Sequence, residues 1–286
     1  MYTVAAFDSP LHEKAKADLV LPEGDVRQFL SEASATFAHI QLCTGTFWVS
    51  KALNMGYVGK TVKGRGPSTV IKFLPFIPPS GGESLIHCGD PRGVSISDLM
   101  LDGNRLKPDR TNNQIPEGSQ HFGLYVSSPN INWHADMDGI QIHNIWMRQV
   151  GTCGLLMENV QGATGNNIQM QEVGSFAVYH GMFHLTNVRR SSFSMLNGRI
   201  GCIGIRLINS YKNNIGNCNF STIDDEGIIF DGPATQHNTI SNSVVTDCGG
   251  PCLRLQSEPS HNQVSACVLT GGSNEYRAPE NTSPKA

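Results

Sequence analysis

The sequence has little charge, no basic cluster and no long hydrophobic run. Asp, Glu, Lys and Arg make up 16% of the 286 residues, whereas an average soluble domain has about a quarter. The formal net charge is −3, and no run of Lys and Arg suggests a surface for nucleic acid. No stretch approaches the roughly 20 apolar residues that a membrane-spanning helix needs. Neither nucleic acid nor a membrane is therefore expected as a partner.

A signal peptide and a cysteine framework are also missing. The N-terminal segment lacks a basic region followed by an apolar one, so we expect a cytoplasmic or virion-associated protein, or a secreted one whose signal has been removed. The eight cysteines form no CxxC pair and no zinc-binding pattern. We expect free thiols that pack as small hydrophobic side chains, which favours a reducing compartment.

What the chain does contain is a repeat. From residue 123 onward, a small residue opens a short apolar strand at intervals of 23–31 residues. The openings are Gly123, Gly154, Ala177, Gly204, Gly227 and Cys252. Most units also contain an Asn shortly before an aliphatic residue, and these are Asn144, Asn167, Asn187, Asn214, Asn238 and Asn262. Short strands closed by Gly and Asn turns predict the coils of a parallel β-helix, with Asn in left-handed turn geometry.

Alternation along each strand predicts which side chains point inward. The predicted inward pairs are Leu124/Val126, Leu155/Met157, Val178/His180, Ile205/Leu207, Ile228/Phe230 and Leu253/Leu255. Five of the six pairs are apolar, and only His180 interrupts the pattern. The predicted outward side chains include Tyr125, Glu158, Tyr179, Arg206, Asp231 and Arg254.

The N-terminal part predicts a cap. Residues 24–35 have Asp25 as an N-cap and an apolar stripe of Val26, Phe29 and Leu30, which predicts a short helix over the open end of the solenoid. The predicted organisation is an N-terminal extension (1–17), a β-helix domain (18–272) and a tail (273–286). Within the domain, residues 18–38 form the cap and residues 39–272 form the coils.

After the predicted helix come Gly45-Thr-Phe-Trp-Val, Lys63-Gly-Arg-Gly-Pro-Ser-Thr-Val-Ile and the strand 96–104. This order resembles the first coils of the pectate-lyase-like superfamily, including phage tailspike β-helices. The resemblance covers about residues 18–272. It implies an all-β, single-stranded right-handed parallel β-helix with a short N-terminal capping helix, acting on a polysaccharide.

The motifs of individual activities are missing. The chain has no Asn-Thr-Asp motif of polygalacturonases, no Arg-x-Pro-x-x-Arg of pectate lyases and no Asp-Pro-His of alginate epimerases. Asp224-Asp225 resembles the paired Asp of polygalacturonases, without its companions. Lyase, hydrolase and epimerase chemistry therefore stay open.

Two turns, 104–122 and 127–138, are each about ten residues longer than a solenoid turn needs. They flank the strand of Tyr125, so we expect them to form the walls of a groove. The catalytic candidates are Asp136, Asp138, Glu158, His121 and His134. The substrate-binding candidates are Tyr125, Trp133, Tyr179, Arg105, Lys107, Arg206 and Arg254. Paired carboxylates suit hydrolysis, and a base beside a cation suits uronate lyase or epimerase chemistry.

The acidic run Asp224-Asp225-Glu226 permits two interpretations. It is either part of a surface ion-pair ladder with Arg206, Arg254 and Asp231, or a functional site. Such a site would be a clamp for a substrate carboxylate, or would bind Ca²⁺ with Asp224 and Asp225 as metal ligands. The sequence requires no other cofactor.

Two functions follow from these features. The first is an enzyme, a polysaccharide lyase or glycoside hydrolase, that cleaves or modifies an extended, acidic polysaccharide in a groove on the side of the β-helix. The alternative is a non-catalytic glycan-binding or structural β-helix that assembles with copies of itself, as a trimer if it is tailspike-like.

Overall fold

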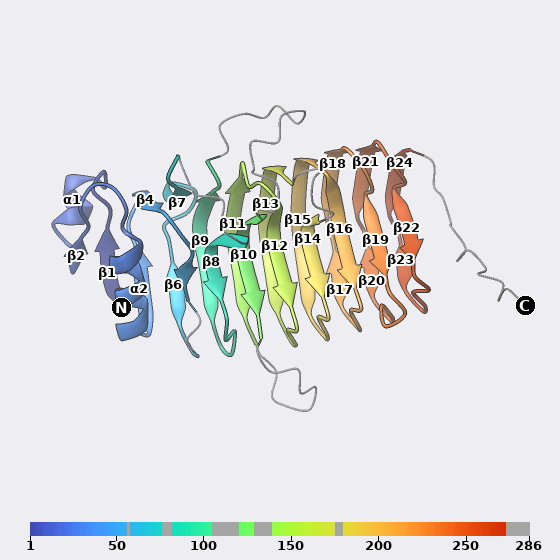
Figure 1. Ribbon diagram of the computed structural model, residues 1–286, viewed down its shortest axis with the longest axis horizontal. Helices are drawn as coiled ribbons and strands as arrows, with labels where there is room; N and C mark the ends of the chain where they lie inside the picture. The colour runs from blue at the N-terminus through green and yellow to red at the C-terminus, as the bar shows by residue number, and fades with distance from the viewer. Residues whose placement is uncertain (56–57, 76–81, 105–119, 129–138, 175–179, 273–286) are drawn as a thin grey trace, which may run out of the picture.

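The computed structural model describes residues 1–55, 58–75, 82–104, 120–128, 139–174 and 180–272. Within these residues the chain winds into a solenoid of two parallel β-sheets that enclose one core. Figure 1 shows the strands stacked side by side along the long axis of the molecule, from blue near the N-terminus to red near the C-terminus. The predicted parallel β-helix is confirmed.

Sheet B contains one strand from each coil that contributes to it. Its strands are β5 (Leu53–Asn54), β8 (Gly82–Cys88), β10 (Gln120–Ser127), β12 (Cys153–Glu158), β14 (Gly181–Thr186), β16 (Ile203–Ile208), β19 (Ile228–Asp231) and β22 (Leu253–Gln256). Each strand pairs in parallel with the next one along the solenoid.

Sheet A contains the remaining strands. They are β1 (Tyr2–Ala5), β2 (Leu19–Val20), β3 (His39–Leu42), β4 (Gly45–Val49), β6 (Thr61–Lys63), β7 (Thr69–Phe73), β9 (Ser95–Asp102), β11 (Gln141–Arg148), β13 (Thr164–Val173), β15 (Ser192–Gly201), β17 (Asn214–Gly216), β18 (Asn219–Ile223), β20 (Thr239–Ser241), β21 (Val244–Cys248), β23 (Gln263–Ser265) and β24 (Val268–Gly271). In the later coils two short strands take the place of one long strand, as β17 and β18 do beside β15.

The predicted inward register is confirmed for five of the six units. Leu124 pairs with Leu155, and Ile205 pairs with Ile228, which pairs in turn with Leu253. The third unit is wrong, because β14 begins at Gly181 and its Phe183 and Leu185 align with Leu155 and Met157. Met182, not Ala177, therefore continues the row of openings, and the inward pair Val178/His180 is replaced by Phe183/Leu185.

The physical reason for this shift is that the observed register buries the large apolar ring of Phe183 in place of the His180 ring. Phe183 is fully buried and packs edge-on against Phe193, with ring centroids 4.8 Å apart. The segment that begins at Ala177 matched the small-residue pattern equally well, but it would have placed His180 in the apolar core. His180 instead lies before β14 and is half-buried.

Asparagines hold the corners of the solenoid in two ways. Asn144, Asn167 and Asn187 have φ of 53°, which confirms the predicted left-handed geometry there. The prediction is wrong for Asn214, Asn238 and Asn262, which do not have positive φ. Asn238 and its neighbours serve differently, because they form a ladder of amide hydrogen bonds inside the solenoid. The Nδ2 of Asn213 donates to Asn238 Oδ1, and the Nδ2 of Asn238 donates to Asn262 Oδ1, each at 2.9 Å.

The N-terminal helix is confirmed, with differences in detail. Helix α2 (Arg27–Thr36) buries Leu30 against the core, but Phe29 is 42% exposed and so does not belong to the predicted apolar stripe. Asp25 precedes the N-cap residue, Val26, and accepts a hydrogen bond from the backbone N–H of Arg27 at 3.0 Å.

The first residues of the chain join the sheet. Strand β1 pairs with β3, and a short helix, α1 (Leu11–Lys14), lies between β1 and β2. The predicted boundary at residue 18 therefore falls inside the first coil. No helix among the described residues is long and apolar enough to cross a membrane.

A substitution in the asparagine ladder tests whether its hydrogen bonds stabilise the stacked coils. We expect Asn238→Ala to lower the free energy of unfolding by about 3 kcal/mol, because it leaves buried partners of Asn238 without a hydrogen bond. One of these partners is the backbone N–H of the buried Asn213, which donates to Asn238 Oδ1 at 3.1 Å. Urea unfolding measures the change. Asn214→Ala is the matched control, because Asn214 is exposed, and equal losses in both variants would contradict the role of the ladder.

Candidate functional site

The outer face of sheet B presents side chains in aligned rows. Because each strand is in register with the next, equivalent outward residues lie about 4.8 Å apart. One row contains His87, Tyr125, Leu156, His184, Arg206, Ile229 and Arg254. The neighbouring row contains Ser127, Glu158, Thr186, Ile208, Asp231 and Gln256. Five of the predicted outward side chains thus share one face.

Tyr125 and Glu158 are in direct contact at one end of this face. The Tyr125 hydroxyl donates to Glu158 Oε2 at 2.6 Å, and the His87 ring stacks on Tyr125 with centroids 4.9 Å apart. Burial, together with the bond to the Glu158 carboxylate, raises the pKa of Tyr125 to about 12. Tyr125 therefore remains a hydrogen-bond donor at neutral pH. His121, earlier on the same strand, lies beside Phe73 with ring centroids 5.8 Å apart.

The middle of the face holds two histidines in contact. The Nδ1 atoms of His180 and His184 are 2.8 Å apart, and Thr186 Oγ1 lies 3.3 Å from His184 Nε2. Burial lowers the pKa of His180 to about 4 and that of His184 well below its usual value, and the charge of Arg206 acts in the same direction. Both rings are therefore neutral at pH 7. Sequence reasoning missed this pair, because it assigned His180 to the core.

The two arginines predicted to bind substrate are engaged in ion pairs. Arg206 Nη2 lies 2.8 Å from Asp231 Oδ2, and both side chains are largely buried. Arg254 forms an ion pair with Glu226, which is 1% exposed. Because each guanidinium already has a carboxylate partner, its positive charge is largely neutralised. This arrangement corresponds to the ion-pair ladder rather than to a clamp for substrate carboxylates.

The acidic run contains two carboxyl groups with different protonation. Burial, a hydrogen bond with the Glu226 side chain and the nearby negative charges raise the pKa of Asp225 to about 6. Arg254 counteracts part of this rise. A hydrogen bond between two carboxyl groups requires a proton on one of them, so the bond of Asp225 to Glu226 forms when Asp225 is protonated, below about pH 6.

A metal site finds no further support at this place. Across the part of the chain that the structure describes, no group of three or more His, Cys, Asp or Glu side chains is arranged to hold a metal ion. Asp224 and Asp225, the predicted Ca²⁺ ligands, therefore lack a third partner of these types among the described residues.

Several predicted site residues lie outside the described residues. They are Arg105, Lys107, Trp133, His134, Asp136, Asp138 and Tyr179. The groove walls that the sequence predicts from the two long turns also lie there. The described part of the predicted site is thus the sheet B face from Tyr125 to Arg254.

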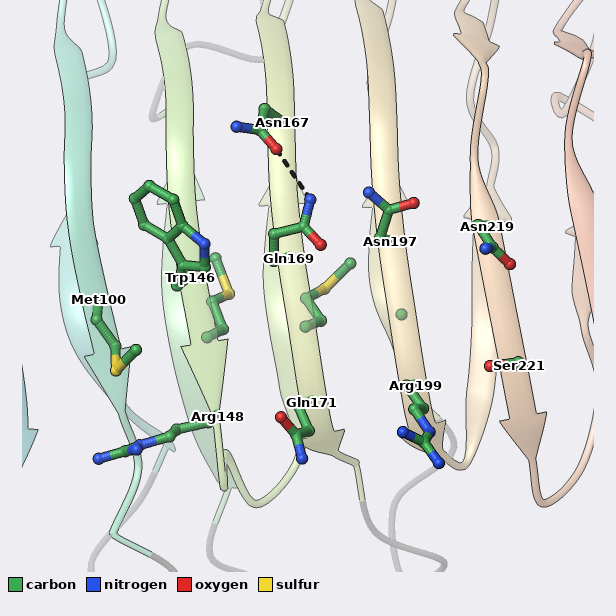
Figure 2. A pocket seen from close by; sticks show the side chains of 13 residues that line it. Met100, Trp146, Arg148, Asn167, Gln169, Gln171, Asn197, Arg199, Asn219 and Ser221 are labelled. Atoms are coloured by element: carbon green, nitrogen blue, oxygen red, sulfur yellow. Dashed lines mark hydrogen bonds between the residues drawn. The ribbon is translucent and has the colours of Figure 1, made fainter. Parts of the chain in front are cut away.

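Sheet A carries an open groove that sequence reasoning did not identify. Its volume is about 790 Å³, and it runs across β9, β11, β13, β15 and β18. Figure 2 shows Trp146, Gln169, Asn197 and Asn219 on consecutive strands, with Arg148, Gln171, Arg199 and Ser221 in the next row. The alternation along these strands could have identified the residues as outward. The predicted groove was instead placed beside the two long turns, on sheet B.

The buried histidines make stability depend on pH. The unfolded chain takes up protons on His180 and His184 below about pH 6.5, whereas in the fold His180 stays neutral until about pH 4. Since both pKa values are depressed in the fold, the free energy of unfolding is highest above pH 6.5 and falls as the pH is lowered through this window. We expect a loss of up to about 1.4 kcal/mol per pH unit from each histidine.

Urea unfolding of the wild-type protein and of His180→Leu at pH 7 and pH 5 measures this effect. The variant should show a clearly smaller loss on acidification. An identical loss in both proteins would mean that other groups cause the pH dependence.

This chain is similar to known proteins in structure, but no match was found by sequence. No protein-family model and no curated protein matches the chain. Several solved structures share its architecture at low sequence identity. The enzymatically active domain of tailspike protein 2 from bacteriophage CBA120 has a TM-score of 0.61 and 14% identity, over 88% of this chain and 41% of that one.

Two polysaccharide hydrolases are also similar to this chain in structure. The catalytic domain of an α-1,3-glucanase of glycoside hydrolase family 87, in complex with nigerose, has a TM-score of 0.59 and 14% identity, over 87% of this chain and 44% of that one. An endo-xylogalacturonan hydrolase from Aspergillus tubingensis has a TM-score of 0.51 and 11% identity, over 96% and 86%. This chain therefore spans less than half of the first two proteins. At these identities the similarity concerns the fold alone, which is a right-handed parallel β-helix.

Proposed function

We propose that this protein is a glycoside hydrolase that cleaves an extended polysaccharide on the outer face of sheet B. The observation that carries the proposal is the acidic run, where Asp225 has a raised pKa of about 6 and bonds to Glu226, whose side chain pairs with Arg254. Glycosidases use two carboxyl groups in one site, a proton donor and a carboxylate partner. Their different surroundings give the two groups different pKa values. The shared fold with an α-1,3-glucanase and an endo-xylogalacturonan hydrolase supports the same class of reaction.

Asp225 is the proposed proton donor. It gives its proton to the glycosidic oxygen as the bond between that oxygen and the anomeric carbon breaks. Asp224, the preceding residue of the same turn, is half-buried, and its negative charge contributes to the raised pKa of Asp225. Asp224 is the proposed base, which takes a proton from the water whose oxygen bonds to the anomeric carbon.

Glu226 and Arg254 are positioning residues in this scheme. Arg254 holds the Glu226 carboxylate in place, and Glu226 in turn bonds to Asp225. The Arg254 charge also limits the rise in the pKa of Asp225. The pair therefore keeps Asp225 in the range where it can both hold and release a proton near neutral pH.

Tyr125 and Glu158 suit a binding role for the same substrate. Strand β12, which carries Glu158, lies three rungs from β19, next to the acidic run. Three rungs correspond to about 14 Å, too far for one bond to be cleaved between the two places. Tyr125 is half-buried, and the hydrogen bond from its hydroxyl to Glu158 fixes the position of its ring. This pair would contact a different sugar of the same chain.

The proposal is tested by the loss of the proton donor. We expect Asp225→Asn to lower the release of reducing ends at least about a hundredfold, because general acid catalysis contributes that much or more. Reducing-sugar assays on α-1,3-glucan, polygalacturonate and xylogalacturonan measure the rate. Glu158→Gln is the matched control, and we expect it to weaken substrate binding while retaining turnover at saturation. Loss of turnover in Glu158→Gln with wild-type rates in Asp225→Asn would overturn the assignment.

The pH profile gives an independent test. Because Asp225 donates a proton, kcat/KM should fall as the pH rises through about 6, where this carboxyl group loses its proton. The residual activity of Asp225→Asn should lack this fall. An unsaturated, ultraviolet-absorbing product would indicate a lyase, and glycan binding without cleavage would indicate the non-catalytic alternative; either result overturns the hydrolase.

A further inference from the structure

The groove on sheet A is separate from the acidic run. Sheets A and B enclose the same core, and the groove lies on the outer face of sheet A. Its described lining contains two arginines and no Asp or Glu side chain. The groove therefore offers no described carboxyl group for proton transfer, but it does offer a surface for binding.

The groove presents one ligand-binding side chain per rung. Trp146, Gln169, Asn197 and Asn219 occupy equivalent positions on four consecutive rungs (Figure 2). Their row is about 14 Å long at the spacing of parallel strands. A ligand that itself repeats along its length fits such a row better than a compact molecule does. The half-buried Trp146 offers a flat apolar face at one end, and the amides offer donors and acceptors for hydroxyl groups.

The second row gives the groove a positive charge. Asp102 is fully buried and is shared by Arg148 at 2.7 Å and Lys72 at 3.2 Å. Among the described residues, no carboxylate forms an ion pair with Arg199. The charged side chains in the described lining of the groove are Arg148 and Arg199, both positive, whereas the whole chain has a net charge of −3. The local charge is thus opposite in sign to that of the protein.

Gln169 and Arg148 are held in place before any ligand binds. Gln169 Nε2 donates to Asn167 Oδ1 at 2.9 Å (Figure 2). Asn167 Nδ2 in turn donates to Asn144 Oδ1 at 2.9 Å. Arg148 is fixed by two contacts with Asp102, from Nε at 2.9 Å and from Nη2 at 2.7 Å. Fixed side chains lose less entropy on binding, which makes a shallow groove a more effective binding surface.

We propose that the sheet A groove is a second polysaccharide-binding surface, specific for an anionic polysaccharide whose chain runs across the strands. A sugar ring stacks on Trp146, the amides of Gln169, Asn197 and Asn219 bond hydroxyl groups, and Arg199 binds carboxylate or sulfate groups. Guanidinium groups match the geometry of these anions. The site goes beyond the proposed hydrolysis, because it holds the polysaccharide on a different face from the one where cleavage takes place.

Single-stranded nucleic acid is the competing anionic polymer. Surfaces that bind it use aromatic rings under successive bases along a basic groove. The sheet A groove has one aromatic ring in its described lining, and amides occupy the following rungs. This composition favours a ligand with many hydroxyl groups over one with many stacked bases.

Equilibrium binding with defined probes tests the proposal. The probes are polygalacturonate, alginate and chondroitin sulfate as anionic polysaccharides, dextran as a neutral one, and a single-stranded DNA oligonucleotide. We expect at least one anionic polysaccharide to bind, with affinity that falls as salt is added. Trp146→Ala and Arg199→Gln should each weaken binding at least about tenfold, and Arg199→Gln should also reduce the salt dependence.

Two controls separate this site from the catalytic proposal. Lys212→Gln removes the same charge from an exposed corner outside the groove and should leave binding unchanged. Asp225→Asn should bind the probes as tightly as the wild-type protein, whatever its effect on turnover. The proposal is overturned if none of the anionic polysaccharides binds, if DNA binds in their place, or if Trp146→Ala and Arg199→Gln bind like Lys212→Gln.

Discussion

The parallel pairing of each coil with the next, almost without a change of register, is the constraint on which the molecule depends. Because the strands stay in register, a residue type repeated in the sequence becomes a row on the surface. The interior ladder through Asn213, Asn238 and Asn262 and the left-handed turns at Asn144 and Asn167 hold the coils at a fixed angle to one another. The chemistry of both faces follows from this regularity.

The two faces use charge in opposite ways. On sheet B the positive charges are neutralised within the protein, because Arg206 and Arg254 each pair with a largely buried carboxylate. What remains available there is a carboxyl group with a raised pKa, at Asp225. On sheet A one buried carboxylate, Asp102, is shared by two cations, and Arg199 adds a third. One face is thus arranged for proton transfer and the other for holding anions.

Most of the fold could be predicted from the sequence, because a coil repeat and a two-residue alternation are both local patterns. The prediction failed at the third coil, where two segments matched the pattern and only packing of Phe183 on Phe193 distinguished them. The outward positions of Tyr125 and Glu158 were predictable for the same reason. The partners of Arg206 and Arg254, the contact of His180 with His184 and the groove beside Trp146 were not, because each depends on side chains from different coils that approach only in three dimensions.

The column of equivalent turns has an evolutionary consequence. A duplication or loss of one complete coil preserves every pairing on either side of it, so the solenoid can change length in whole steps of about 4.8 Å. Each step would add or remove one position from the row that begins at Trp146, and so change how many sugar units that row spans. A deletion of part of a coil would instead displace all later outward residues, which leaves whole-coil changes as the route by which such a surface can be adapted to longer or shorter chains.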